Sequence, residues 1–280
     1  MINKIESFLD IKIIDSKSLG GGCIADSRVI EDNTGKKYFL KHYVTNSSIH
    51  RAEADGLTEI LKFGAIRVPK VIYADDSFLL LEFINSKPKT KNFFSDFGKK
   101  FADLHKVTCE NFGFFENNFI GTNPQKNLPR YRNWIDFYVE NRLLFQFQLA
   151  EKNGYVSDEM KKYFDKFIQT LPSLLPGSEE NPSLLHGDLW GGNYITDENG
   201  EVCLIDPAVY YGDREADLAM TKLFGGFNHD FYEAYNEEYP LRPGHSERED
   251  IYKLYHVMNH LNLFGGSYYH QTISILKRYI

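Results

Sequence analysis

The spacing of hydrophobic positions divides the chain into a strand-rich first part and a helix-rich second part. Runs at 12–19, 23–30 and 37–44 favour β-strands because they are short and rich in β-branched and aromatic residues. The segments between them, 20–22 (Gly-Gly-Gly) and 32–35 (Asp-Asn-Thr-Gly), are typical turn sequences. The pattern therefore predicts an antiparallel meander at the start of the chain.

A helix over 47–63 follows the meander, because apolar residues return there at helical spacing. Glu53 lies within this apolar stripe, and a carboxylate on an apolar face needs a partner. Two further strands are predicted over 70–74 and 77–84. The first part of the chain thus reads as three strands, one helix and two strands.

Beyond residue 84 the pattern becomes mostly helical, with a β-hairpin over 193–205 and a long loop over 108–130. This order predicts an α+β bilobal fold like that of protein kinases, with a small antiparallel β-sheet lobe over 1–84 and a larger, mostly helical lobe over 85–280. A cleft between two such lobes is a natural ligand site. The predicted helices are 92–107, 131–153, 157–171, 213–223, 231–239 and 247–263.

The segment from His186 to Asn193 carries the strongest chemical signal. It contains His-x-Asp, four further residues and Asn, which is the spacing of a kinase catalytic loop. The predicted hairpin then returns the chain, so that Asn193 and Asp206 meet at its open end. Their oxygens suit Mg²⁺, and Asp188 can accept the proton of an attacking hydroxyl. The alternative, a capped turn beside an ordinary hairpin, does not account for all three spacings.

The first part of the chain supplies matching residues for a nucleotide. Lys41, in the third predicted strand, can hold the α- and β-phosphates of ATP if a helix carboxylate fixes it. Glu53 is the expected partner, with Glu59 as the alternative. Gly20, Gly21 and Gly22 can close over the phosphates because glycine leaves the backbone amides accessible, although the segment also fits a plain hairpin turn.

Several further residues can take part in nucleotide binding or catalysis, or can have a purely structural role. The backbone of Glu82, Phe83 and Ile84 can bind the adenine edge, or can simply end a strand. Asp217, at the start of a predicted helix, can accept backbone amides of the catalytic loop beside His186, or can interact with the helix dipole alone.

Composition narrows the function classes. The formal net charge of −7 comes without a concentrated basic segment, which disfavours nucleic acid as a partner. Three irregularly spaced cysteines favour neither a disulfide framework nor a zinc site. The start of the chain lacks the apolar core of a signal peptide, and no apolar run is long enough to span a membrane. We therefore expect a cytoplasmic protein.

Taken together, these motifs resemble the fructosamine kinase (ketosamine 3-kinase) family of the protein-kinase-like superfamily. The resemblance extends over nearly the whole chain. One departure is Gly191, where the family more often has Ser. The matching segments are Gly21–Ile24, Arg67–Pro69, Phe112–Phe114, Asn118–Gly121, Pro124–Gln125, Asn133–Trp134, Arg142–Leu143, His186–Trp190 with Asn193, Ile205–Ala208, Tyr211–Asp217, Leu223–Phe227, Asn259–Leu261 and Phe264–Gly266.

The resemblance implies a reaction and a set of roles. Family members use ATP to phosphorylate the 3-hydroxyl of a ketosamine, which is the sugar adduct of a glycated amine, and the product then releases the amine. By this resemblance Asp188 is the base, Asn193 and Asp206 bind the metal, and Lys41 with Glu53 anchors the phosphates. The partner is a glycated small molecule or protein, and the choice of sugar and amine stays open.

Two site hypotheses are less specific. Trp190, next to the catalytic loop, is the expected wall for the sugar, with Phe227 and His260 as weaker candidates that core packing would also explain. Cys23, in the glycine-rich turn, can be a redox-active thiol that links two chains into a dimer, or a small buried residue. The resemblance includes relatives with a redox-responsive cysteine at this place.

Two other functions stay open on sequence alone. The first is a kinase of another small alcohol, of the aminoglycoside or choline kinase type, which would share Asp188, Asn193 and Asp206. The second is a pseudokinase that only binds nucleotide, which the presence of Lys41 and these three residues disfavours.

Overall fold

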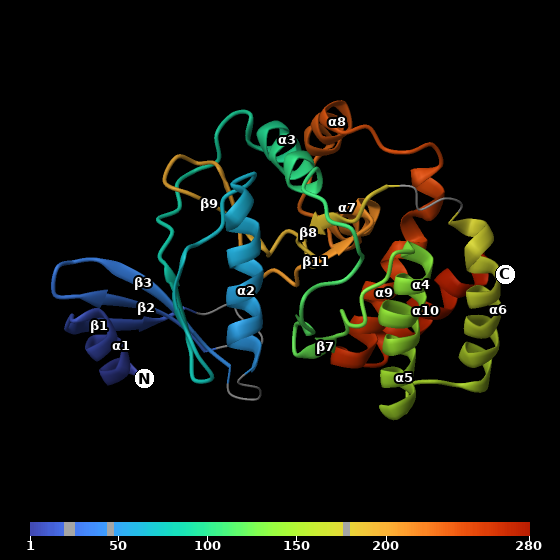
Figure 1. Cartoon of the computed structure of the whole chain (residues 1–280), viewed down its shortest axis with the longest axis horizontal. Coiled ribbons are helices and arrows are strands. Elements are labelled where there is room, and N and C mark those ends of the chain that lie inside the picture. Colours follow the sequence, from blue (N-terminus) through green and yellow to red (C-terminus); the bar gives the residue numbers. More distant parts are fainter. Residues whose placement is uncertain (20–25, 44–47, 176–179) are drawn as a thin grey trace. The chain divides into compact units, whose positions relative to one another are not determined.

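The first structural unit is built on a five-stranded antiparallel sheet (Figure 1). The computed structural model describes residues 1–19, 26–43, 48–175 and 180–280. The sheet order is β1-β2-β3-β5-β4, so the predicted meander is present. The strands are β1 (Ile13–Ser18), β2 (Asp26–Asp32), β3 (Lys37–His42), β4 (Val71–Ala74) and β5 (Leu79–Glu82).

Side chains at the β2–β3 turn explain why the chain reverses there. The Asp32 carboxylate accepts hydrogen bonds from the backbone amides of Thr34 and Lys36, at 2.8 and 3.0 Å. Gly35 takes a φ of 85°, a left-handed conformation that glycine adopts without steric cost. The Asp-Asn-Thr-Gly signal in the sequence thus corresponds to a hydrogen-bonded turn.

Two helices belong to this unit. The α2 helix (Ser48–Phe63) is the predicted helix, and its inner face buries Glu53 among apolar residues. The α1 helix (Ile2–Leu9) was not predicted; Ile5 joins the buried cluster of Ile30, Leu40 and Leu80. Eight residues are too few for helical periodicity to give a clear signal. Short helices are marginally stable by themselves, so the packing of Ile5 on the sheet stabilises this one.

The hairpin β9 (Tyr194–Thr196) and β10 (Val202–Leu204) also belongs to the first unit. The Leu204 amide donates to the Arg67 carbonyl at 2.8 Å, and the Lys87 amide donates to the Asp197 carbonyl at 3.1 Å. These bonds join the hairpin both to the sheet side and to the segment after residue 84. The units are therefore Met1–Phe93 with Tyr194–Asp206, and Phe94–Asn193 with Pro207–Ile280. This differs from the division after residue 84 that we expected.

The second unit is mostly helical, as predicted, and α9 lies at its centre, packed against α5, α7 and α10 (Figure 1). Side-chain caps start several helices at the expected positions; the Ser157 hydroxyl accepts the Met160 amide at 3.1 Å. The helices are α3 (Phe93–His105), α4 (Trp134–Tyr138), η1 (Val139–Leu143), α5 (Leu144–Lys152), α6 (Asp158–Leu174), α7 (Arg214–Leu223), α8 (His229–Glu238), α9 (His245–Phe264) and α10 (Ser267–Arg278).

The second unit departs from the predictions in three places. The predicted helix over 131–153 contains a π-helical turn, η1, and α10 was not predicted. The long loop over 108–130 contains the short hairpin β6 (Asn118–Ile120) and β7 (Asn123–Gln125). Strands β8 (Ser183–Leu185) and β11 (Tyr210–Gly212) pair across the catalytic segment. Within the described part of the chain, no helix is both long and apolar enough to cross a membrane.

Candidate active site

The predicted catalytic loop, from His186 to Asn193, follows β8 and is held by Asp217 on α7. The Asp217 carboxylate accepts the backbone amides of His186 and Gly187, at 2.6 and 2.8 Å. Burial by itself raises the pKa of Asp217, but its hydrogen bonds with His105 and Gly187 and the nearby His186 outweigh burial and lower the pKa. The Asp217 carboxylate therefore favours its ionised form and accepts the backbone amides of the loop, as the sequence predicted.

Gly187 explains the tight course of the loop. Its φ is 82°, and a Cβ atom there would lie 2.0 Å from the Ala208 carbonyl oxygen. The Ala208 amide in turn donates to the His186 carbonyl at 2.8 Å. A side chain at position 187 would push these segments apart, so the loop requires glycine.

Asp188 and Asn193 contact each other at the two ends of the loop. The Asn193 side-chain amide donates to the Asp188 backbone carbonyl at 2.7 Å and to its Oδ2 atom at 3.2 Å. This orientation leaves the Asn193 Oδ1 atom to accept from another group. The Asp188 amide also donates to His186 Nδ1 at 3.3 Å, so His186 supports the loop from within.

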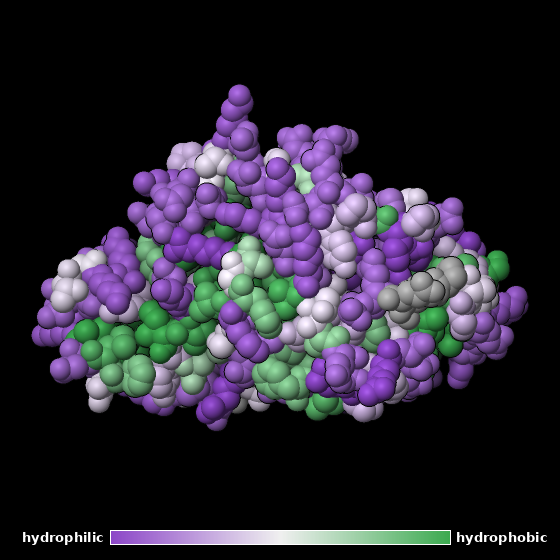
Figure 2. All heavy atoms as spheres, turned by 45° about the horizontal axis from the view of Figure 1, so that its top comes forward, coloured by the Kyte–Doolittle hydropathy of each residue, from purple (hydrophilic) through white to green (hydrophobic). Residues whose placement is uncertain are grey.

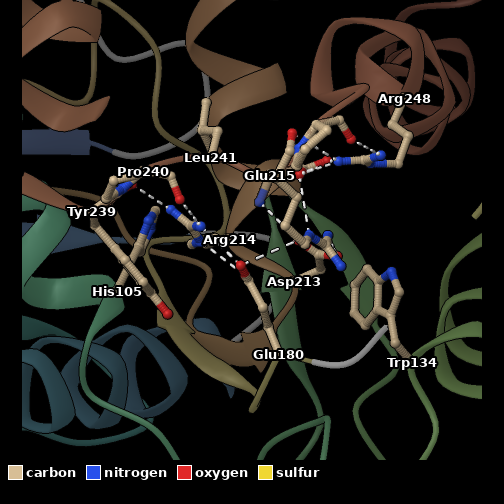
Figure 3. Close-up of polar contacts among 12 residues, drawn as sticks. His105, Trp134, Glu180, Asp213, Arg214, Glu215, Tyr239, Pro240, Leu241 and Arg248 are labelled. Carbon is tan, nitrogen blue, oxygen red and sulfur yellow. Dashed lines mark hydrogen bonds and ion pairs between the residues drawn. The ribbon is translucent and has the colours of Figure 1, made fainter. Parts of the chain in front are cut away.

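The α7 helix that carries Asp217 is fixed by buried ion pairs at its first turn (Figure 3). Arg214 donates to both oxygens of Glu180 at 2.8 Å, and Arg248 donates to both oxygens of Glu215, at 2.7 and 2.6 Å. Asp213 caps the helix by accepting the Glu215 amide at 3.0 Å. The sequence analysis did not predict this network, because the partners lie far apart in the chain. The high charge density of 213–217 was the one indication of it in the sequence.

In the first unit, Lys41 lies between two carboxylates. Its Nζ atom is 2.8 Å and 3.0 Å from the two oxygens of Glu53 and 2.6 Å from Asp206 Oδ1. Burial lowers the pKa of Lys41, but the negative charges of Asp206 and Glu53 outweigh it and raise the pKa well above its usual value. The alternative partner Glu59 instead lies 3.9 Å from Lys62. The structure thus pairs Lys41 with Glu53.

Asp206 has a left-handed backbone conformation. Its φ is 55°, in the region that aspartate and asparagine adopt more readily than other residues with a side chain. Its side chain keeps 46% of its surface exposed although it contacts Lys41. An exposed carboxylate held next to a cation is a suitable ligand for a metal–nucleotide complex.

The remaining nucleotide-site predictions meet different outcomes. The Glu82 side chain accepts from Arg67 at 3.0 Å, and the Glu82 amide donates to the Lys70 carbonyl at 2.9 Å. The side chain and the amide of Glu82 thus stabilise the first unit. Phe83 and Ile84 follow the end of β5 and stay candidates for the adenine edge. Gly20, Gly21, Gly22 and Cys23 lie outside the described residues.

Of the three aromatic candidates, the structure brings two together. Trp190 and His260 both contact Phe224, with ring centroids 6.2 Å and 4.6 Å apart. Phe227 instead contacts Phe97 and Phe231, which belong to a buried cluster. Phe224 was not predicted as a site residue, although it lies in the Leu-Phe-Gly-Gly-Phe segment that the sequence analysis singled out.

The fold and the ion-paired lysine place the chain in the class of protein-kinase-like phosphotransferases. An ADP-bound aminoglycoside phosphotransferase superposes with a TM-score of 0.66 at 14% identity, covering 100% of both chains, which shows the shared fold. A protein from Thermobifida fusca, provisionally named fructosamine-3-kinase, gives a TM-score of 0.89 at 29% identity over 99% of this chain and 97% of the other.

Within the protein-kinase-like phosphotransferases, a comparison with family models identifies one family. The model of the fructosamine kinase family matches residues 4–280, so the chain belongs to that family. A probable ketoamine kinase of Vibrio parahaemolyticus is 38% identical, covering 97% of this chain and 94% of the relative. The chloroplastic protein-ribulosamine 3-kinase of Arabidopsis thaliana is also 38% identical, covering 94% and 82%.

Proposed function

We propose that this protein uses ATP to phosphorylate the 3-hydroxyl of ketosamines of the ribulosamine or fructosamine type. The observation that carries the proposal is the catalytic loop, in which Asp217 holds the backbone and Asn193 orients Asp188, in a member of the fructosamine kinase family. The names of the relatives, ketoamine kinase and ribulosamine 3-kinase, support the acceptor. A 3-phosphorylated ketosamine decomposes and frees the amine, so the activity repairs glycation.

Asp188 is the residue that we assign as general base. Its carboxylate accepts the proton of the 3-hydroxyl while the oxygen bonds to the γ-phosphorus and the bond from that phosphorus to the β-phosphate oxygen breaks. The contact from Asn193 holds the carboxylate in place for this transfer. General-base catalysis of this kind contributes about 10²- to 10⁴-fold in rate.

Lys41, Asn193 and Asp206 are assigned to the phosphates and to Mg²⁺. The donor set fits the ion, because an amide oxygen and a partly exposed carboxylate are the oxygen ligands that Mg²⁺ prefers. Asn193 directly precedes β9 and Asp206 is the second residue after β10, so the two residues flank the hairpin along the chain, which supports the assignment. When bound, the ion would neutralise charge on the phosphates, and Lys41, fixed by Glu53, would hold the α- and β-phosphates.

Other elements of the proposal concern the surroundings of the reaction. Gly20–Gly22 would cover the phosphates, and the backbone of Phe83 and Ile84 would bind adenine. Trp190 and His260 would line the sugar, whose C–H faces suit an aromatic wall. We place the activity in the cytoplasm, where ATP is available, with a glycated small molecule or protein as the partner. A dimer linked through Cys23 stays a prediction.

The decisive test is ATP consumption with synthetic ribulosamines and fructosamines, run for the wild type and for Asp188→Asn. We expect turnover that falls at least about 100-fold in the variant, and ³¹P NMR should locate the phosphate at the 3-position. Phosphorylation of an aminoglycoside or choline but of no ketosamine would favour another small-alcohol kinase. Binding of ATP without phosphorylation of any acceptor would favour a nucleotide-binding pseudokinase.

A further inference from the structure

Two side-chain amides from the β6–β7 hairpin hold the backbone that leads into β11. The Gln125 Nε2 atom donates to the Ala208 carbonyl at 2.8 Å, and the Asn118 Nδ2 atom donates to the Val209 carbonyl at 2.7 Å. Both side chains are buried, with 1% and 3% of their surface exposed. Because Ala208 and Val209 are consecutive, the two amides fix a short stretch of backbone at two successive carbonyls.

Hydrogen-bond partners fix the orientation of the Gln125 amide. Its Oε1 atom accepts from the Tyr255 hydroxyl at 2.7 Å, and its Nε2 atom also donates to Asn118 Oδ1 at 2.9 Å. A backbone carbonyl can only accept, so the nitrogen of the amide must face Ala208. A flipped amide would place its oxygen against two other oxygens. Gln125 therefore uses both donors and its acceptor, and its side chain has one satisfied orientation.

These polar side chains lie inside the second unit. Figure 2 shows hydrophilic residues over most of one face of the molecule, where water can bond to them. Gln125, Asn118 and Tyr255 are instead buried. A buried carbonyl without a donor costs free energy, and at Ala208 and Val209 the side-chain amides supply the donors. Loss of either amide would leave a carbonyl unpaired and free the backbone of 208–209 to move.

Ala208 connects these amides to the predicted catalytic loop. Its own amide donates to the His186 carbonyl at 2.8 Å, and its carbonyl oxygen lies 2.0 Å from the place that a Cβ atom of Gly187 would take. The Asp188 amide in turn donates to His186 Nδ1 at 3.3 Å. Ala208 therefore bonds to Gln125 through its carbonyl and to the loop through its amide, so a shift of Ala208 is passed to the backbone that carries Asp188.

We propose that Gln125 is a positioning residue for phosphoryl transfer, because its side-chain amide fixes Ala208 and thereby the loop that aims Asp188. This inference rests on the proposed function, in which Asp188 is the general base. Proton transfer requires the base within hydrogen-bond reach of the acceptor hydroxyl, and a displacement of about 1 Å can lower the rate about 100-fold. Loss of the amide therefore lowers kcat and leaves nucleotide binding unchanged, since Lys41 and Glu53 belong to the first unit.

The test variant is Gln125→Met, which keeps the length of the side chain and removes both donors. The matched control is Gln146→Met, because Gln146 is also buried but is hydrogen-bonded to Asn259 and Asn262 on α9. With a synthetic ribulosamine we expect Gln125→Met to lower kcat about 10- to 100-fold and to change the KM for ATP less than about 2-fold. Gln146→Met should change kcat less than about 2-fold, although both variants lower Tm.

A second comparison separates positioning from a loss of folded protein. In an Asp188→Asn background the base is absent, so Gln125→Met should lower the remaining kcat less than about 3-fold, since residues that act as a unit are not additive. A loss of folded protein would lower kcat by the same factor in both backgrounds. Tyr255→Phe removes only the bond to Gln125 Oε1 and repeats the test with a milder change, with kcat about 2- to 5-fold lower and the same dependence on Asp188.

The outcomes distinguish this inference from the proposed function. An unchanged kcat in Gln125→Met, or an equal loss with and without Asp188, would overturn the positioning role while leaving the kinase assignment intact. Absence of turnover on every ketosamine in the wild type would instead overturn the proposed function, and the positioning role with it.

Discussion

Arg142 is a buried cation whose hydrogen-bond partners, among the described residues, include no carboxylate. Its side chain is fully buried, and within the described residues its partners are neutral: the carbonyls of Lys126 and Asn141 and the Asn127 side chain. Its guanidinium also lies 4.0 Å from the centroid of the Tyr210 ring. Carbonyl dipoles and ring faces here replace the carboxylate that a buried cation normally requires.

We expect Arg142→Lys to lower the free energy of unfolding by about 3 kcal/mol, because an ammonium cannot reach the carbonyls that the planar guanidinium bridges and leaves buried acceptors unpaired. Urea denaturation followed by circular dichroism measures the change. Arg28→Lys is the control, since Arg28 is exposed and pairs with Asp26 at the surface; it should change the value by less than about 0.5 kcal/mol. Equal effects of the two substitutions would contradict the role of burial.

His256 makes stability depend on pH. Burial lowers the pKa of His256 to about 3, and its Nδ1 atom has no hydrogen-bond partner among the described residues. The unfolded chain protonates this ring near pH 6.5, so between these pH values the unfolded state binds more protons and stability falls as the pH falls. The contribution is complete above pH 6.5 and is lost progressively below it.

From pH 7.5 to pH 5.0 we expect His256 to account for a loss of about 2 kcal/mol in the free energy of unfolding. Urea denaturation at the two pH values should show a smaller loss in His256→Asn than in the wild type. The exposed His229 offers the comparison, because His229→Gln should keep the full pH dependence. A pH dependence in His256→Asn as large as that of the wild type would rule the explanation out.

At the scale of elements, the hairpin β9–β10 depends on Arg67 more than on its own six paired residues. The Arg67 carbonyl accepts the Leu204 amide, and its guanidinium contacts Asp197 at 2.9 Å and Glu82 at 3.0 Å. Asp206 is the second residue after this hairpin, so the position of the proposed metal ligand depends on these contacts. An isolated hairpin of this length would not hold its shape in water.

We expect Arg67→Ala to raise the Mg²⁺ concentration needed for half-maximal activity about 3- to 10-fold, because the hydrogen-bonded ion pairs of Arg67 with Glu82, Asp197 and Glu198 are lost. Initial rates over a Mg²⁺ series measure the effect. Arg51→Ala is a suitable control, since Arg51 pairs with Asp76 at the surface of the same unit. The prediction is wrong if Arg67→Ala lowers activity equally at all Mg²⁺ concentrations.

At the scale of the whole molecule, the proposed function divides nucleotide binding and chemistry between residues of the two units. The first unit contains Lys41 and Glu53, which are assigned to the nucleotide, and the second contains Asp188. Binding to the folded state raises stability by mass action, whichever residue later carries out the reaction. Nucleotide binding and phosphoryl transfer should therefore be separable by mutation.

We expect ATP with Mg²⁺, at about 100 times its dissociation constant, to stabilise the wild type and Asp188→Asn alike, by about 2.7 kcal/mol. Thermal unfolding should show this as a similar rise in Tm for both proteins. Lys41→Met should fold and lose most of the rise, because the phosphates then lack their cation. A variant Asp188→Asn that no longer responds to ATP would contradict this division.

The sequence by itself determined the division into a strand-rich and a helix-rich part and several local features. The β2–β3 turn, the α2 helix and the spacing of Asp188, Asn193 and Asp206 were readable because turn chemistry, helical periodicity and short loops act over a few neighbouring residues. The pairing of Lys41 with Glu53 was also predictable, since an apolar helix face does not hold a carboxylate without a partner.

The tertiary structure decided what depends on residues far apart in the chain. It assigned the hairpin over 194–206 to the first unit, packed Phe227 against Phe97 and Phe231, and joined Trp190 to Phe264 through Phe224 and His260. It also placed the π-turn at Arg142, within a segment whose periodicity reads as an uninterrupted helix. These features arise from packing and from ion pairs between distant segments. The local pattern of hydrophobic and polar residues does not predict which distant segments come into contact.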